Sequence, residues 1–84
     1  MTDAQKTEIL ETFARLTEEM LSLERLAKDC EHIGDEAGRM NALRRLAFAS
    51  GRHKGYQDAL YDCGYWIDDD AEGGALVLER RTAW

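Results

Sequence analysis

The chain has 84 residues, 44% of them hydrophobic and 33% charged, and its formal net charge is −6. This length accommodates one domain, and a domain this small usually needs a staple or a partner for stability. No apolar run approaches the roughly 18 residues of a membrane span, and the N-terminus lacks the basic and apolar regions of a secretory signal. Its two cysteines are then typical of a reducing compartment, so we expect a cytoplasmic protein without disulfides.

A first helix is predicted over about residues 3–32. Thr2 and Gln5 have the spacing of a capping box at its start. Apolar residues then recur at alternating steps of four and three, the heptad spacing of a helix that faces a partner helix. This first seam comprises Ile9, Phe13, Leu16, Met20, Leu23, Ala27 and Cys30. We expect the helix to end near Gly34.

A second helix is predicted over about residues 36–63, with Asp35 as its cap. A second seam repeats the same alternating steps through Ala42, Leu46, Ala49, His53, Tyr56, Leu60 and Cys63. Because the register continues past Gly51, we favour one helix over a break at Ser50-Gly51 that would give three helices. Both cysteines and His53 then fall at core positions, where a small hydrophobe or a core histidine is the simplest role.

The short connection between the two seams favours an all-α, antiparallel helical hairpin that resembles a coiled coil, over residues 1–64. Residues 1–36 have a net charge of −6, residues 37–63 of +3, and residues 64–84 of −3. We therefore expect acidic and basic side chains to pair between the two helices.

The seams leave apolar residues unused, among them Leu10, Leu21, Leu43, Phe48 and Tyr61. Either the tail folds back over them, or two hairpins associate into a four-helix bundle, and we favour the homodimer. Small residues recur at every fourth position of the second helix: Ala47, Gly51, Gly55 and Ala59. We expect them to allow close packing, against the first helix or a dimer mate, in preference to a hinge.

Residues 65–84 form an acidic and aromatic appendage. Two short apolar runs, 65–67 and 75–78, flank an acidic turn with glycines, which is compatible either with a small β-hairpin or with an extended arm that orders on a partner. The spacing of Asp68, Asp70, Glu72, Gly73 and Glu79 matches a calcium loop. Its fifth position is Glu and too few residues follow for an exiting helix, so a solvated acidic turn is favoured over a calcium-responsive site.

No catalytic or cofactor motif is present in the sequence. Cys30, His32, His53 and Cys63 are zinc-ligand types, but about 36 Å of helix separates the two ends of the hairpin, at 1.5 Å per residue. A phosphate loop and a nucleophile elbow are absent, and a two-helix hairpin offers no enclosed pocket for a reaction. We expect a protein that is not an enzyme and that holds no cofactor or metal.

The surface most typical of an interaction site lies on the second helix, where three arginines surround one aromatic ring. We call Arg44, Arg45, Phe48 and Arg52 the basic-aromatic face. A second candidate is the aromatic set Tyr65, Trp66 and Trp84. The face favours a protein partner over a nucleic acid, because the whole chain is acidic. In the alternative without a binding role, these arginines pair with Glu residues of the first helix while Phe48 packs under the tail.

The run Arg52-His53-Lys54-Gly55-Tyr56-Gln57-Asp58-Ala59-Leu60, in a small acidic helical chain with eight Arg and three Lys, resembles the orphan helical proteins encoded by bacteriophages of high-GC hosts. The resemblance covers mainly the second helix, and no site residues transfer with it. It implies a small accessory protein that binds and modulates or inhibits a host protein in the host cytoplasm.

Overall fold

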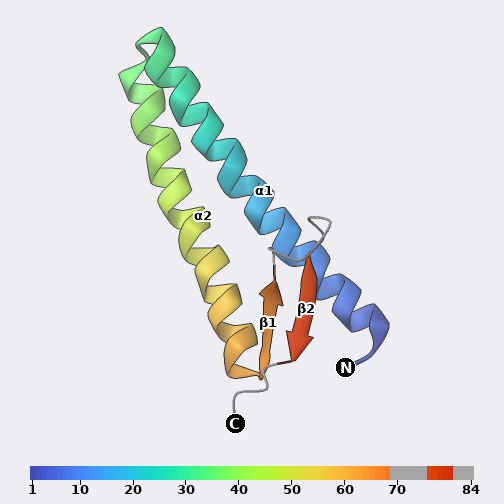
Figure 1. Ribbon diagram of the computed structural model, residues 1–84. Helices are drawn as coiled ribbons and strands as arrows, with labels where there is room; N and C mark the ends of the chain where they lie inside the picture. The colour runs from blue at the N-terminus through green and yellow to red at the C-terminus, as the bar shows by residue number, and fades with distance from the viewer. Residues whose placement is uncertain (69–75, 81–84) are drawn as a thin grey trace.

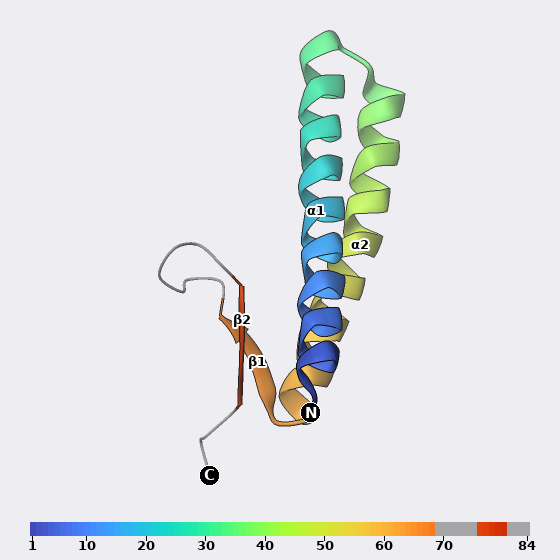
Figure 2. The ribbon, with the colours of Figure 1, turned by 90° about the vertical axis from the view of Figure 1, so that its right-hand side faces the viewer.

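The computed structural model describes residues 1–68 and 76–80, which form two long helices and a small β-hairpin (Figure 1). Helix α1 spans Asp3–Ile33 and α2 spans Glu36–Asp62, followed by strands β1 (Tyr65–Asp68) and β2 (Val77–Arg80). The helices run antiparallel and meet at a closed end around Gly34, and the β-hairpin lies on one side of the pair near the open end (Figures 1 and 2). The predicted helical hairpin is confirmed.

Local sequence signals set the helix ends. Thr2 accepts a hydrogen bond from the Gln5 amide while the Gln5 side chain accepts one from Thr2, so the predicted capping box is formed. Gly34 ends α1 in the left-handed conformation, with φ of 78°, and Asp35 then caps α2 by accepting the Gly38 amide at 2.9 Å. A single short connection therefore reverses the chain, and α2 runs without a break through Ser50-Gly51.

The two predicted seams pack against each other as the core. Every residue of the first seam is buried or half-buried, and Phe13, Leu23, Ala27 and Cys30 are the most enclosed. In the second seam Ala42 and Ala49 are buried, and the other positions before Cys63 are half-buried: Leu46, His53, Tyr56 and Leu60. The prediction is wrong at Cys63, which is exposed because α2 ends at Asp62 and the backbone of Cys63 serves as the cap. Both cysteines are free.

His53 is a core histidine, as expected. Its ring lies 4.6 Å from that of Phe13, centroid to centroid, and its Nε2 lies 3.1 Å from the hydroxyl of Thr17. The Thr17 hydroxyl also donates to the Phe13 carbonyl, at 3.0 Å. The contact between Thr17 and His53 ties α1 to α2 within the seam.

The tail forms the β-hairpin alternative rather than an extended arm. β1 and β2 pair antiparallel with Ile67 opposite Leu78, so the second strand begins two residues later than the predicted apolar run. Leu76 lines a pocket with Phe13, Met20 and Leu21, which shows that the tail folds back on the first helix. Leu21 nevertheless stays 46% exposed, and Leu43, Phe48 and Tyr61 are exposed as well, so most of the apolar surplus remains at the surface. None of the described helices combines the length and apolarity that crossing a bilayer needs.

Candidate functional site

The basic-aromatic face is fully presented to solvent. Phe48 is 74% exposed, although it is a large apolar side chain in the middle of a helix. The Arg52 guanidinium carbon lies 5.8 Å from the centre of the Phe48 ring, within range of a cation–π contact. Phe48 does not pack under the tail, so that part of the alternative is wrong.

Charge pairing between the helices is much smaller than the sequence predicts. Within the described residues one ion pair joins α1 to α2, between Glu19 and Arg52. Arg44 and Arg45 are exposed and have no ion-pair partner among the described side chains. The expected internal pairing is therefore wrong for two of the three arginines. Arg44 lies on the outer side of α2, and Arg45, one heptad from Arg52, lies across from the apolar Leu26 and not from a carboxylate. Their charge remains available to a binding partner.

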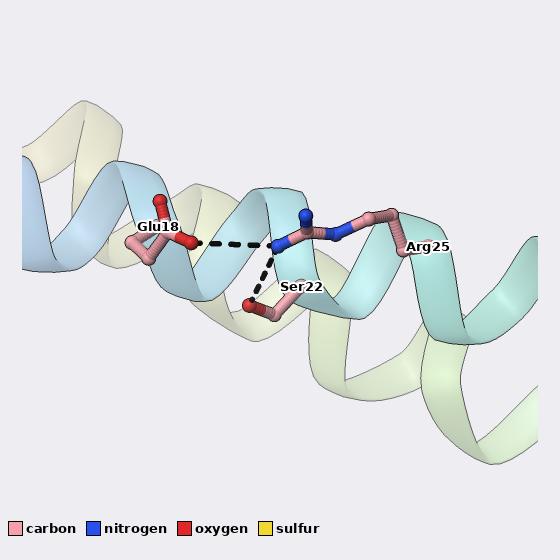
Figure 3. A network of polar contacts seen from close by, with 3 residues as sticks. All are labelled: Glu18, Ser22 and Arg25. Carbon is pink, nitrogen blue, oxygen red and sulfur yellow. Dashed lines mark hydrogen bonds and ion pairs between the residues drawn. The ribbon is translucent and has the colours of Figure 1, made fainter.

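The other ion pairs are local to one helix. Arg25 donates to Glu18 and to the Ser22 hydroxyl, each at 3.4 Å, along the outer surface of α1 (Figure 3). Arg39 pairs with Glu36 at 3.0 Å in the first turns of α2. Such exposed pairs stabilise by about 1 kcal/mol at most. They leave the acidic excess of α1 and the basic excess of α2 in place.

The Glu19–Arg52 pair defines one long side of the hairpin. In a helical pair, residues one heptad apart lie on the same side. Leu26 is one heptad from Glu19 and Arg45 is one heptad from Arg52, both toward the closed end, so Leu26 lies across from Arg45 on this side. Leu26 is 42% exposed, and Ile33, one further heptad along, is 77% exposed. We call this side, with Glu19, Leu26 and Ile33 on α1 and Arg45, Phe48, Arg52 and Gly55 on α2, the open flank.

The opposite side of the helical pair is occupied near the open end by the β-hairpin (Figure 2). Toward the closed end it forms a groove of about 340 Å³. The groove is lined by Glu24, Ala27, Lys28, Glu31, Arg39, Leu43 and Leu46. Sequence reasoning missed this groove, although residues 24 and 31 are one heptad apart beside the first seam.

The small-residue stripe does not pack against α1. Ala47, Gly51, Gly55 and Ala59 are all exposed, and a Cβ built on Gly51 or Gly55 would meet no atom within 4 Å. The expectation of close packing on the first helix is wrong, because the seam at Ala49 and His53 points to α1 and the stripe points elsewhere. Packing on a dimer mate stays a prediction.

The second aromatic candidate is not joined to the basic-aromatic face. Tyr65 is half-buried in β1, and Trp66 lines a shallow pocket with Gln57 and Tyr61 on the β-hairpin side of α2. Trp84 lies outside the described residues. The two nominated surfaces therefore lie on different sides of the hairpin.

The zinc-type residues and the calcium-loop spacing noted in the sequence do not form a metal site among the described residues. No group of three or more His, Cys, Asp or Glu side chains there could hold an ion. Of the calcium pattern, Asp68 lies in β1 and Glu79 in β2, whereas Asp70 and Glu72 lie outside the described residues. A calcium loop of this spacing leads into a helix, and here its last position lies in a strand.

No protein-family model, curated protein or solved structure matches this chain. Support for a function therefore comes from the described surface alone. On that surface the basic-aromatic face combines an exposed aromatic anchor with unpaired guanidinium groups.

Proposed function

We propose that the chain is a non-enzymatic protein-binding module that acts through the basic-aromatic face. The exposure of Phe48, 74% beneath the Arg52 guanidinium, is the observation that carries this proposal. Aromatic and Arg side chains are enriched among the residues that dominate binding energy at interfaces, and an exposed ring of this size loses contact with water when a partner covers it.

The chemistry of the face selects an acidic partner surface. Arg44 and Arg45 present guanidinium groups that bond carboxylates in bidentate geometry, while Phe48 supplies apolar contact between them. A regulator associated with nucleic acid is the second candidate, since the same groups bond phosphates. The formal net charge of −6 disfavours it, because nucleic-acid affinity rests on neutralising phosphates.

The resemblance to small phage-encoded proteins supports a host protein as the target, modulated or inhibited by occupation of its surface. We also propose that the chain forms a homodimer in the cytoplasm of the cell that contains it. Large apolar side chains exposed on both helices, including Leu26, Ile33, Met40 and Phe48, support self-association.

A cross-linking pull-down tests the binding role. Wild type and Phe48→Ala are compared on lysate of the producing cell, with Leu43→Ala as the matched control, because Leu43 is an exposed apolar residue on the opposite side of α2. We expect one retained protein to be lost with Phe48→Ala and kept with Leu43→Ala. Equal retention by all three chains would remove the basic-aromatic face as the binding surface. A sub-micromolar and strongly salt-dependent affinity for DNA or RNA would favour the second candidate.

A further inference from the structure

Among the described residues, no segment outside the two helices covers the open flank. The β-hairpin lies on the opposite side of the pair (Figure 2), and the residues that line the groove belong to that side as well. On the open flank, large apolar side chains are exposed on both helices: Leu26 and Ile33 on α1, and Phe48 on α2. The flank therefore exposes apolar side chains on both helices at once.

The two helices carry opposite charge on this flank. On α1, Glu8, Glu19 and Asp29 outnumber Arg15. On α2, Arg45 and Arg52 outnumber Asp62, which lies one heptad beyond Gly55, while Arg44 and Asp58 lie at the margin. Of the charged side chains on this flank, Glu19 and Arg52 form the one ion pair among the described residues. From residue 19 to the closed end, the flank is therefore acidic on α1, at Glu19 and Asp29, and basic on α2, at Arg45 and Arg52.

We propose that the partner of the open flank is a second copy of the chain, related by a twofold axis parallel to the helices. The inference rests on one part of the proposed function, that the basic-aromatic face binds protein, and it replaces the host protein by a second copy as the partner that covers Phe48. A twofold axis in this direction places α1 of each copy on α2 of the other, antiparallel, with both closed ends at the same end. In the half of the flank toward the closed end, Glu19 and Asp29 of each copy then meet Arg45 and Arg52 of the other, and both contacts form together. At the open end Glu8 comes level with Asp62, a like-charge pair that these contacts must outweigh.

The positions of the residues along the twofold axis, here called their heights, agree with this arrangement. An axis parallel to the helices keeps every residue at its own height, so Arg52 of one copy meets Glu19 of the second copy, which stands level with it. Arg45 and Phe48 come level with the segment from Ser22 to Leu26 of the second copy, and Asp29 lies one helical turn beyond. Phe48 thus gains an apolar neighbour, and Arg45 gains a carboxylate.

Gly55 acquires a role in this dimer. It lies on the open flank seven residues beyond Phe48, and a Cβ there would meet no atom within 4 Å beyond the backbone of its own helix. The absence of a side chain lets an opposing helix approach closely. This open space is independent of the charge pattern, and it occurs on the side where the charges place the second copy.

Reciprocal charge reversal tests the dimer. Arg45→Glu places Glu against Asp29 in a homodimer, and Asp29→Arg places Arg against Arg45, so each variant alone should dissociate about tenfold more readily than wild type. A mixture of the two variants restores an opposite-charge pair at both contacts and should dimerise as tightly as wild type. Lys54→Glu, an exposed reversal outside the open flank, is the matched control and should leave dimerisation unchanged.

The masses are measured by sedimentation equilibrium at low salt, with circular dichroism confirming that every variant is folded. Wild type is expected at twice 9.6 kDa. The relative orientation of the two copies is tested separately, by the distance between two spin labels, one on the exposed Cys63 of each copy in a Cys30→Ala background. If the closed ends of the two copies lie together, the two labels should be about 15–30 Å apart, because neighbouring helices are spaced by 8–10 Å. Closed ends at opposite ends predict about 40 Å, because α2 has 27 residues at 1.5 Å each.

The outcomes separate this inference from the proposed function. A monomeric wild type overturns the inference, and so does a dimer that both reversals leave intact or a label separation near the longer value. If a monomer still captures a protein that Phe48→Ala loses, the proposed function stands and only the self-partner is refuted. A dimer that passes the mixing test, with equal pull-down by wild type and Phe48→Ala, supports the inference and removes any external partner.

Discussion

Replacing glycine by alanine should raise the stability of the folded chain at some positions and lower it at others, because the glycines lie in different surroundings. Gly51 and Gly55 lie inside α2 with no atom within 4 Å of a built Cβ. Glycine inside a helix is about 1 kcal/mol less favourable than alanine. Gly51→Ala with Gly55→Ala should therefore stabilise the monomer by about 2 kcal/mol, which for a domain of this size raises Tm by about 8–16 °C.

Gly34 and Gly38 provide the controls of opposite sign. Gly34 has φ of 78°, where alanine is strained, and a Cβ on Gly38 would lie 2.3 Å from Oδ2 of the Asp35 cap. Alanine at either position should destabilise by about 1 kcal/mol or more. Urea unfolding followed by circular dichroism, at a concentration low enough for monomers, measures the stability of the double variant and of the two controls. Destabilisation by Gly51→Ala and Gly55→Ala would show that these positions are packed within the chain and would refute the reasoning.

Three further predictions concern the seam, the cap and the thiols. Phe13→Ala removes a ring that is 3% exposed and should cost about 3–5 kcal/mol in chemical unfolding, enough to unfold much of the protein; a cost below about 1 kcal/mol would contradict the packing against His53. Asp35→Ala removes the α2 cap and should cost about 1 kcal/mol, whereas an unchanged unfolding midpoint would show that the cap contributes nothing. In native protein a thiol reagent should modify Cys63 within the mixing time and Cys30 only on unfolding, and equal rates would contradict the burial of Cys30.

Periodic and capping signals made the helices predictable from sequence. The heptad steps from Ile9 to Cys30 and the caps at Thr2 and Asp35 are local, so each can be read without knowledge of the rest of the fold. Cys63 departs from the pattern because a heptad position has no meaning once the helix has ended. The exact pairing of Ile67 with Leu78 depends on contacts across a turn, and no local signal specifies it.

The candidate site was predictable in composition and less so in its surroundings. The positions of Arg44, Arg45, Phe48 and Arg52 show that they share one face, and the exposure of Phe48 agrees with that. Net charges of the two helices, however, do not say which side chains can reach each other. Only the structure shows that Glu19 meets Arg52, while Arg44 and Arg45 have no ion-pair partner among the described side chains.

The contact of Leu76 with the pocket around Phe13 has a consequence for the order of folding. The helices meet through a two-residue connection, so their contacts close short loops and form early. Residues 13 and 76 are separated by most of the chain, and bringing them together costs more loop entropy. The helical hairpin should therefore assemble first from its closed end, and the open end consolidates last, when the β-hairpin docks.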